Sequence, residues 1–532
     1  MATEYAYSVC LAQDATVVIV VYRTIPQLLS DAAERDPGGV WLRWDSDGDS
    51  DGDEVSLTFA DATGRAARTA QRLREAGIRH GDLVLITARN TPAYLLCWLG
   101  LVSLGGVAVT VNPQSAPAEL AGLLRQTPPR AVITDAGLRP LFAGAPSVLD
   151  VETLAGAATG AAELPTGAVR PDDVAVLIPT SGTTGRSKLV MQTHRAYTMA
   201  GEGFPHWLGL TADDRLMTSL PLFHINAPAY SVMGSLACGA GLVLLPRFSA
   251  SGFLDAARRH GATEFNAIGA MVEILMRQPE RTDDADSPLR LCYTGPAPGR
   301  QRQEQIERRF GLRIVCGYAL SETTYGLVWP RGSRPFGTLG RPRQHPTLGT
   351  VNEARVVAQD GRPLGVGETG ELLLRNPAVT PGYWGMPDET ARAIVDGWLH
   401  TGDLVTVNAD GTYTFVARAK EVLRRRGENL SPLEVEEALL GHPAVQDCAV
   451  VGVPSELSEE EVKAFVVLAP GRRADFAELR SWAASRLAAF KVPRFWQVID
   501  ELPRTPTARV AKHRLPPGHP ADEYDAEPEA RM

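Results

Sequence analysis

The alternation of helices and strands along the first part of the chain restricts its fold more than any other feature. An amphipathic stretch that ends at Gly77 precedes the apolar run 83–87. Thr91 and Pro92 then begin another helix, which leads to the apolar run 107–111. Strands that are separated by helices pair in parallel, because a crossover helix returns the chain to the same edge of the sheet. The sequence therefore predicts parallel sheets covered by helices.

The same alternation returns between residues 216 and 315, where apolar runs such as 241–245 alternate with helical stretches such as 253–260. Two similar α/β layers are therefore expected. After Gly337 the pattern changes to short alternating strands with Gly and Pro turns, as at 370–375, which predicts a small β-rich layer.

A different compact unit is expected beyond Arg418. Ser431, Pro432 and Glu434 have the pattern of a capping box with proline at the first helical position. A helix, two strands and another helix follow. The final residues, from about 517, are rich in Pro, Asp and Glu and are predicted to be a disordered tail.

The sequence thus predicts an α/β fold with two domains. A length of 532 residues and a hydrophobic content of 44% support more than one large core. The N-terminal domain, residues 1–418, is expected to hold both α/β layers and the β-rich layer. The C-terminal domain, residues 419–532, is expected to be a small mobile α+β unit.

Composition also restricts the partners and the compartment. A net charge of -9, and no Lys/Arg cluster that alternates with aromatics, argue against a nucleic-acid partner. The six cysteines lack the spacing of a zinc site or a disulfide framework, which favours a reducing cytoplasm. The apolar run 17–22 is too short to cross a bilayer, and the acidic N-terminus lacks the cationic start of a signal peptide. We therefore expect a cytoplasmic protein without a membrane span.

The run from Thr180 to Lys188 consists of small, flexible and hydroxylated residues and ends on one cation. Its glycines let backbone N–H groups approach phosphate oxygens, its hydroxyls donate hydrogen bonds and Lys188 supplies charge. The spacing is not that of the P-loop of NTPases, and a flexible glycine-rich hairpin is the alternative interpretation. The predicted phosphate-binding residues are Thr180, Ser181, Gly182, Thr183, Thr184, Gly185 and Lys188.

This loop resembles the phosphate-binding signature of the adenylate-forming superfamily, which includes acyl-CoA synthetases, luciferases and the adenylation domains of peptide synthetases. Other motifs follow in the family's order, so that the resemblance covers roughly residues 25–515. It implies an AMP-forming ligase that binds ATP, Mg²⁺ and a small-molecule acid. It also implies a mobile C-terminal domain that brings in the thiol of CoA or of a carrier protein. A homodimer is a further expectation, because homodimers are common among such relatives.

The segment 221–226 resembles the family motif that borders the pocket for the acid substrate. Residue chemistry alone favours a hydrogen-bonded core histidine for His224, whereas the order of the motifs favours the pocket. At Ala319 the family most often has glycine, and the extra methyl group should narrow the acyl channel, which favours small or planar acids. The predicted acid-pocket residues are His224, Asn226, Ala227 and Ala319.

Two further segments resemble the family's nucleotide site. Residues 295–298 resemble the segment that lies along adenine, where small side chains let the backbone approach a flat base; without the other motifs they would be a turn. In the motif 317–322, Glu322 is expected to hold Mg²⁺ between phosphate oxygens, and a solvated turn carboxylate is the alternative. The resemblance implies Gly295, Pro296 and Ala297 along adenine, Tyr318 stacked on it and Ser321 at a phosphate.

Residues 397–403 resemble the ribose motif, in which Asp403 accepts hydrogen bonds from both ribose hydroxyls. The resemblance places Arg418 near the ribose, and Lys420 absorbs the backbone rotation of a hinge. The cationic run that follows resembles the lining of the pantetheine tunnel and the CoA site, and an exposed cationic loop is the alternative. The implied CoA residues are Arg424, Arg426 and Gly427.

The largest departure from the family pattern lies at 503–510. This motif ordinarily ends Thr, Gly, Lys, Ile, and its lysine bridges the substrate carboxylate and the α-phosphate. Here the glycine is Ala508 and the lysine is Arg509. Arginine keeps the charge but is not interchangeable with lysine at a close-packed site. Three interpretations stay open: Arg509 acts in the lysine's place, Lys512 does so, or adenylation is weakened or redirected.

The leading hypothesis is an ATP-dependent acid:CoA ligase that forms an acyl-adenylate with release of pyrophosphate and then a CoA thioester. The stretches 223–227 and 246–251 are most similar to crotonobetaine/carnitine-type CoA ligases. The second hypothesis is an enzyme of secondary metabolism that passes the adenylate to a carrier protein or an amine, or activates nitrite to give diazo or N–N products. A noncatalytic nucleotide-binding protein is the third. The predicted catalytic residues are Lys188, His224, Glu322, Arg509 and Lys512.

Overall fold

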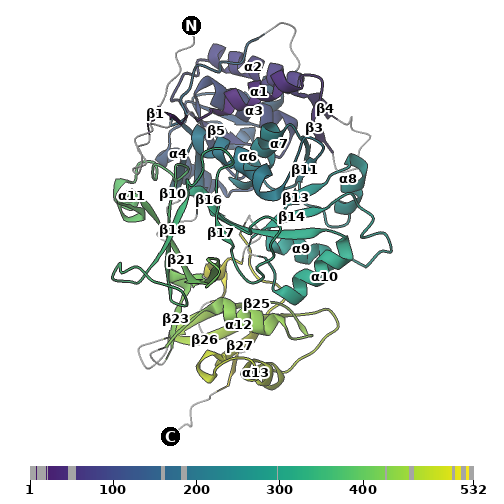
Figure 1. Ribbon diagram of the computed structural model, residues 1–532, viewed down its shortest axis with the longest axis vertical. Helices are drawn as coiled ribbons and strands as arrows, with labels where there is room; N and C mark the ends of the chain where they lie inside the picture. The colour runs from purple at the N-terminus through teal and green to yellow at the C-terminus, as the bar shows by residue number, and fades with distance from the viewer. Residues whose placement is uncertain are drawn as a thin grey trace. The chain divides into compact units, whose positions relative to one another are not determined.

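The computed structural model describes residues 7–8, 19–20, 22–45, 55–156, 162–180, 188–295, 297–425, 428–454, 460–505, 510–516 and 523–526 (Figure 1). The chain divides into two compact units. Unit 1 comprises Met1–Ala354 and Leu373–His400, and unit 2 comprises Arg355–Leu372 and Thr401–Met532. The predicted boundary at Arg418 is a hinge about which one domain rotates, so this division by contacts does not test it and the boundary stays a prediction.

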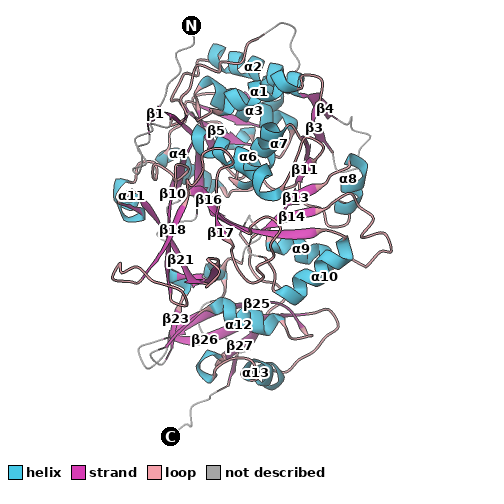
Figure 2. Cartoon of the chain, in the orientation of Figure 1, coloured by secondary structure: helices cyan, strands magenta, loops and turns pink. Residues whose placement is uncertain are grey.

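A six-stranded sheet in unit 1 contains the strands of the first helix–strand alternation. Two of its strands, β5 and β10, are labelled in Figure 2. All neighbouring strands pair in parallel except β9 and β10, which form an antiparallel hairpin. The predicted strand at 83–87 is confirmed at both ends. In spatial order the strands are β10 (Lys188–Thr193), β9 (Val174–Thr180), β6 (Val107–Thr110), β5 (Leu83–Thr87), β7 (Ala131–Thr134) and β8 (Val148–Asp150).

Helix α3 (Pro92–Leu104) begins where the sequence predicts. Thr91 Oγ1 accepts the N–H of Tyr94 at 3.2 Å, Pro92 occupies the first turn, and Gly105 ends the helix at a φ of 87°. The helix is buried from Ala93 to Leu104, because it packs against α1 (Ile25–Arg35), α2 (Phe59–Glu75) and α5 (Val151–Ala155). It has 13 residues, and no helix in the described part of the chain combines the length and apolarity that crossing a bilayer requires.

The second sheet of unit 1 has nine strands. In spatial order they are β17 (Arg341–Pro342), β16 (Thr323–Val328), β15 (Arg313–Leu320), β14 (Leu291–Thr294), β13 (Glu264–Asn266), β11 (Arg215–Thr218), β12 (Gly241–Leu244), β3 (Val40–Trp44) and β4 (Val55–Thr58). The six strands from β15 to β3 pair in parallel, so their carboxyl ends meet at one edge. In open α/β sheets, ligands bind at that edge. The predicted helix at 253–260 is α8 (Phe253–His260).

Helices cover both faces of the six-stranded sheet. Val84 and Ile86 of β5 belong to the main core of unit 1, whereas Leu85 belongs to a smaller cluster with residues of α4 (Pro117–Gln126). Successive side chains of a strand point to opposite faces, so each face meets its own layer. The main core also contains residues of the nine-stranded sheet and of helices α1, α2, α3, α6 (His194–Leu208) and α7 (Met233–Cys238). The two predicted α/β layers are confirmed.

The strands of the predicted β-rich layer form one five-stranded sheet. The division between the two units runs through three of its strands, β18, β19 and β21. In spatial order the sheet contains β18 (Glu353–Val357), β19 (Thr369–Arg375), β21 (Trp398–Val407) and β20 (Ile394–Val395), and β22 (Tyr413–Arg418) also pairs with β21.

Unit 2 has the predicted α+β composition but lacks the predicted capping box. Its four-stranded sheet has the order β25 (Val445–Pro454), β26 (Glu460–Leu468), β27 (Phe495–Val498), β28 (Tyr524–Asp525), with helices α12 (Pro432–Leu440) and α13 (Phe476–Ala484). Pro432 occupies the first turn of α12 as predicted. Ser431 Oγ, however, donates to the carbonyl of Val416 at 2.6 Å and makes no capping bond. A tertiary partner on β22 therefore replaces the local one.

The prediction of a disordered tail from about 517 is wrong for residues 523–526. Strand β28 pairs with β27, and Asp525 accepts two hydrogen bonds of 2.9 Å from the guanidinium of Arg494. Glu523 pairs with Lys463, and both side chains are buried. These acidic residues fold because their carboxylates meet cations beside the sheet, which composition cannot reveal.

Candidate functional site

The predicted phosphate-binding lysine lies at the base of a hairpin on a sheet edge. Lys188 begins β10, the outermost strand of the six-stranded sheet, and pairs with Thr180 at the end of β9. Thr180 Oγ1 donates to the carbonyl of Lys188 at 3.3 Å. The loop 181–187 lies outside the described residues, and with it the predicted Ser181, Gly182, Thr183, Thr184 and Gly185.

Lys188 is connected to Glu322 through a third side chain. Its Nζ lies 4.9 Å from the ring centroid of Tyr383, and the Tyr383 hydroxyl donates to Oε1 of Glu322 at 2.9 Å. The same Nζ lies 2.5 Å from Oε2 of Glu389 in α11 (Pro387–Ala393). The structure thus brings together the predicted phosphate lysine and the predicted metal carboxylate.

Lys188 and Glu389 are both accessible, with 27% and 30% of their side chains exposed. Hydrogen bonds from Lys188 and Arg392 lower the pKa of Glu389, so this carboxylate stays ionised at neutral pH. A phosphate group that approached Lys188 would meet an ammonium that already has an anionic partner.

Glu322 lies in the tight turn between β15 and β16. Its carbonyl accepts the N–H of Thr380 at 2.7 Å, and the carbonyl of Ser321 accepts a hydrogen bond from the Gln192 side chain. The backbone of the turn is therefore held by two other segments. Among the described residues, no group of three or more His, Cys, Asp or Glu side chains could hold a metal ion. Glu322 fits Mg²⁺ in the way that enzymes often bind it, through one carboxylate and the oxygens of a phosphate substrate.

The backbones of the two predicted adenine segments approach each other closely. A Cβ atom on Gly295 would lie 1.9 Å from the carbonyl oxygen of Gly317, and one on Gly317 would lie 2.3 Å from Tyr293 Oη. Only glycine fits at either position. The close approach brings the carboxyl ends of β14 and β15 side by side. Of the predicted residues, Gly295, Ala297 and Tyr318 lie at these ends, and Pro296 is outside the described residues.

Polar contacts hold the predicted acid motif in place. Asn90 Oδ1 accepts the N–H of Leu222 at 3.0 Å, and Thr110 Oγ1 donates to the carbonyl of Phe223 at 2.8 Å. The ring of His224 lies next, with its centroid 4.5 Å from that of Phe223. Asn90 and Thr110, near the carboxyl ends of β5 and β6, therefore hold the two residues that precede His224.

Asn226 has a partner that the sequence analysis did not identify. Its Oδ1 accepts a hydrogen bond from Nδ2 of Asn266 at 2.8 Å. Asn266 ends β13, which lies between β11 and β14 in the sheet, and it is 1% exposed. Its Oδ1 has no hydrogen-bond partner among the described residues. A buried carbonyl oxygen without a partner raises the free energy of the folded state, so Asn266 is a further candidate for contacting a ligand.

The remaining acid-pocket predictions differ in accessibility. Ala227 begins the π-helical turn η2 (Ala227–Val232) and is fully buried in the core, whereas Ala319 in β15 is partly buried. Turns of this kind are frequent at functional sites. Asn266 belongs to the three-residue strand β13, Glu264–Asn266, which has no apolar run in the sequence that could have marked it.

The predicted ribose residues form a pair within unit 2. Asp403 in β21 lies opposite Arg418 in β22, and its Oδ1 is 2.8 Å from Arg418 Nε. Arg418 also donates to the carbonyl of Thr401 at 3.1 Å. Asp403 is 1% exposed. Because its carboxylate already pairs with Arg418, a sugar hydroxyl that bound Asp403 would share the carboxylate with a guanidinium.

In the described part of the cationic run after the predicted hinge, Arg425 has a structural role. Arg425 is 1% exposed, its Nε lies 2.5 Å from Oε2 of Glu461, and its Nη1 donates to the carbonyl of Val492 at 2.8 Å. Arg425 is therefore part of the interior of unit 2. For the predicted hinge and CoA residues, the structure describes only the backbone of Lys420 and Arg424, and leaves out Arg426 and Gly427.

Lys512 already has an ion-pair partner in unit 2. Its Nζ lies 2.7 Å from Oε1 of Glu436, and the same oxygen accepts the N–H of Val450 at 2.8 Å. A carboxylate that is itself held by β25 therefore neutralises Lys512. Arg509 lies outside the described residues.

The described cysteines are poor nucleophiles. Burial raises the pKa of every one of these thiols, so they stay protonated at neutral pH. The predicted chemistry, which depends on charge and positioning, does not require a thiolate. The pKa rises to about 11 for Cys238 and about 12 for Cys316, and it also rises for Cys97, Cys292 and Cys448.

Comparison with known proteins identifies a family and close relatives. Residues 29–384 match the AMP-binding enzyme family, and residues 434–509 match the AMP-binding enzyme C-terminal domain. The crotonobetaine/carnitine–CoA ligase of Salmonella paratyphi A is 32% identical over 519 residues, which cover 90% of this chain and 99% of that relative.

Solved structures match nearly the whole chain. The anthranilate CoA ligase AuaEII in complex with anthranoyl-AMP has a TM-score of 0.82 at 25% identity, covering 93% of this chain and 97% of that one. The O-succinylbenzoate CoA synthetase MenE from Bacillus subtilis, in complex with ATP and magnesium ion, has a TM-score of 0.80 at 26% identity, covering 92% and 98%.

Proposed function

This chain belongs to the AMP-binding enzyme family and is a ligase of the acyl-CoA synthetase kind, and from this we propose that it is an ATP-dependent acid:CoA ligase. It joins a carboxylic acid to AMP with release of pyrophosphate, and then transfers the acyl group to the thiol of CoA. The first step is needed because neither oxygen of a carboxylate leaves readily. In the mixed anhydride with AMP, one of these oxygens becomes part of a leaving group.

The observation that carries this proposal is the contact chain from Lys188 through Tyr383 to Glu322. It joins an ammonium and a carboxylate, the two groups that a magnesium triphosphate requires. Lys188 binds phosphate oxygens, and Glu322 holds Mg²⁺ against them. When bound, Mg²⁺ neutralises phosphate charge that otherwise repels the attacking carboxylate.

The other nucleotide contacts follow the family motifs. Adenine lies along the closely packed backbones of Gly295 and Gly317. The paired Asp403 and Arg418 bind ribose. The further phosphate and adenine contacts are assigned to Thr180, Ser181, Gly182, Thr183, Thr184, Gly185, Ser321, Pro296, Ala297 and Tyr318.

The acid lies beside His224 and the amide pair of Asn226 and Asn266. The methyl group of Ala319 favours a small or planar acid. The relatives support this size class, because their names give crotonobetaine or carnitine, anthranilate and O-succinylbenzoate as what they act on.

The two steps use two positions of the C-terminal domain, which rotates about Lys420. The proposed boundary at Arg418 falls between the two family matches, which end at residue 384 and begin again at residue 434. Arg509 contacts the carboxylate and the α-phosphate in the first step, and the pairing of Lys512 with Glu436 supports Arg509 in this role. Rotation then exchanges Arg509 for the CoA residues Arg424, Arg426 and Gly427.

Exchange of labelled pyrophosphate into ATP, measured across a panel of small acids and nitrite, tests the proposal. Acid-dependent exchange, followed by thioester formation when CoA is added, is the expected result. The substitution of lysine by Arg509 favours one alternative, a redirected acceptor. Turnover only with a carrier protein, an amine or nitrite would support that alternative. Tight ATP binding without any exchange would contradict both.

A further inference from the structure

Arg343 is a buried cation that has no carboxylate partner among the described residues. Its side chain is 0% exposed. Nη1 donates to Tyr230 Oη at 2.6 Å and to the carbonyl of Thr324 at 2.8 Å. Nε donates to the carbonyl of Leu327 at 3.1 Å, and Nη2 donates to Tyr293 Oη. Burying a guanidinium without a counter-ion is unfavourable, so stability alone does not explain its presence.

Aromatic rings surround the guanidinium. Its Cζ lies 4.7 Å from the ring centroid of Trp207, 5.1 Å from that of Tyr230 and 5.6 Å from that of Tyr293. Attraction between the cation and these rings offsets part of the desolvation. Trp207 Nε1 also donates to the carbonyl of Gln344 at 2.8 Å. The cluster therefore holds both the side chain of Arg343 and the residue after it.

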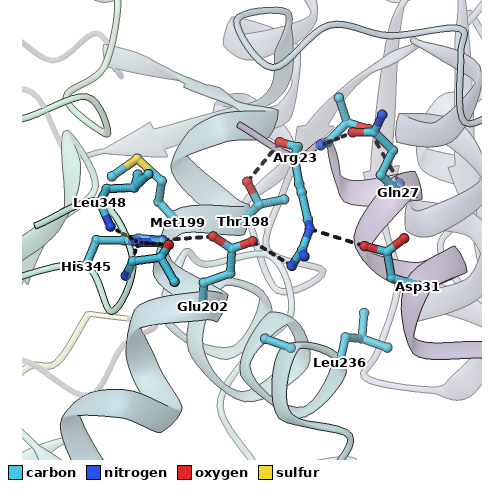
Figure 3. Close-up of polar contacts among 12 residues, drawn as sticks. Arg23, Gln27, Asp31, Thr198, Met199, Glu202, Leu236, His345 and Leu348 are labelled. Atoms are coloured by element: carbon cyan, nitrogen blue, oxygen red, sulfur yellow. Dashed lines mark hydrogen bonds and ion pairs between the residues drawn. The ribbon is translucent and has the colours of Figure 1, made fainter. Parts of the chain in front are cut away.

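The backbone beyond Arg343 is anchored on α6 by a separate polar network (Figure 3). His345 Nδ1 accepts the N–H of Leu348 at 3.3 Å, so Nε2 carries the proton and donates to Glu202 Oε2 at 2.8 Å. Glu202 Oε1 in turn accepts a hydrogen bond from Arg23 at 3.0 Å. Before Arg343, strand β17 pairs with β16, so the guanidinium projects from a segment that is fixed on both sides.

The groups that Arg343 binds lie next to three of the site motifs. They belong to three different elements, η2, β14 and β16. They are Tyr230, in the turn that follows Asn226 of the acid motif; Tyr293, in the strand that ends before Gly295 of the adenine segment; and Thr324, in the strand that follows Glu322. One guanidinium therefore joins the segments that carry all three motifs.

We propose that Arg343 is a positioning residue that sets the spacing between the acid, adenine and metal segments. This inference rests on the proposed function, because that function assigns the three segments to their ligands. Arg343 itself is too deeply buried to touch substrate. It acts through the two tyrosines that it hydrogen-bonds.

Each tyrosine serves a different segment. The ring of Tyr293 fills the space beside Gly317, whose carbonyl lies against Gly295, so Tyr293 acts on the nucleotide side. Tyr230 donates to the carbonyl of Thr324 at 2.8 Å and so fastens the turn that follows Asn226 to the metal segment. The same carbonyl also accepts a hydrogen bond from Arg343, so removal of the Tyr230 hydroxyl acts mainly on the acid side.

Removal of one hydroxyl at a time separates the effect of Tyr293 on the nucleotide from the effect of Tyr230 on the acid. Tyr293→Phe is expected to raise the dissociation constant for ATP about fivefold and to leave the KM for the acid unchanged. Tyr230→Phe is expected to raise the KM for the acid about fivefold and to leave ATP binding unchanged. Tyr325→Phe is the matched control, because Tyr325 is equally buried and donates to the carbonyl of Met199 at 2.9 Å, outside the cluster. It should lower Tm without changing either constant.

Arg343→Lys keeps the charge but replaces a planar guanidinium, which donates hydrogen bonds from three nitrogens, with a single ammonium nitrogen. We expect both constants to rise and kcat to fall about tenfold. If that variant does not fold, the two tyrosine variants decide. The proposal is overturned if both tyrosine variants alter both constants alike, or lower only Tm as Tyr325→Phe does. If the wild type shows no pyrophosphate exchange with any acid, the proposed function is contradicted. The ATP affinity of Tyr293→Phe would still decide whether Arg343 acts on nucleotide binding through Tyr293.

Discussion

Lys188 and Glu389 form an ion pair, with Nζ 2.5 Å from Oε2, although 201 residues separate them in the sequence. The ring of Tyr383 lies beside the ammonium, and its hydroxyl binds Glu322. Glu389 therefore binds the ammonium of Lys188, which the proposed function assigns to a phosphate group. The nucleotide and this carboxylate compete for one cation.

Glu389→Gln is expected to tighten ATP binding about two- to fivefold, because a neutral amide competes less well for Lys188. Isothermal titration calorimetry measures the change directly. Asp388→Asn removes a charge from the same turn of α11 and serves as the control, with no change expected. Weaker ATP binding in Glu389→Gln would show instead that Glu389 orients Lys188 for the phosphate.

Glu322→Gln is expected to lower the rate of pyrophosphate release at least about 100-fold. Glutamine can still accept the hydrogen bond from Tyr383, but it lacks the charge that holds Mg²⁺. Part of the rate should return as the Mg²⁺ concentration is raised. Tyr383→Phe removes only the hydroxyl and should have a smaller effect. A near-wild-type rate for Glu322→Gln would refute the metal role.

Asn266→Leu is expected to raise the KM for the acid about tenfold and to leave ATP binding unchanged, because the apolar side chain offers no acceptor. Asn226→Leu should act in the same direction. In the double variant, the increase in the KM for the acid, expressed as free energy, should be smaller than the sum of the two single effects, since each amide depends on the other. Additive effects on KM would argue that the two residues act independently.

Glu264 makes stability depend on pH. Its side chain is 0% exposed, and neither oxygen has a hydrogen-bond partner among the described residues. Burial, and then the charge of Asp214, raise the pKa of Glu264 well above its usual range. The folded state therefore binds this proton more tightly than the unfolded state does. The contribution of Glu264 to stability is therefore greatest below the unfolded pKa of about 4.3 and falls as the pH rises toward the folded value.

Glu264→Met removes the carboxyl group at similar volume. We expect its Tm to exceed that of the wild type by a margin that grows between pH 5 and pH 8, about 1–3 kcal/mol of unfolding free energy at the upper end. Thermal unfolding of both proteins across this pH range checks the prediction. Glu304→Gln is the control, because the Glu304 side chain is 42% exposed and pairs with Arg300. A margin that does not change with pH would contradict it.

Elements with strong local signals could be predicted from the sequence. Thr91 and Pro92 begin α3 as predicted, and the apolar run 83–87 is β5. Local signals failed where a tertiary partner competed. Ser431 binds the carbonyl of Val416 in place of its own helix, and Glu523 folds against Lys463 despite a tail-like composition. Neither partner is recognisable from neighbouring residues.

By itself, the sequence determined the helices and strands with strong local signals, the α/β class and the family, because turns, periodicity and short motifs depend on near neighbours in the chain. Only the tertiary structure decided which charged and polar side chains meet. Lys188 meets Glu389, and Arg343 meets Tyr230 and Tyr293, which are 113 and 50 residues away. The physical reason is that a hydrogen bond or an ion pair forms only within about 3 Å, and the order of strands and the packing of helices set that distance.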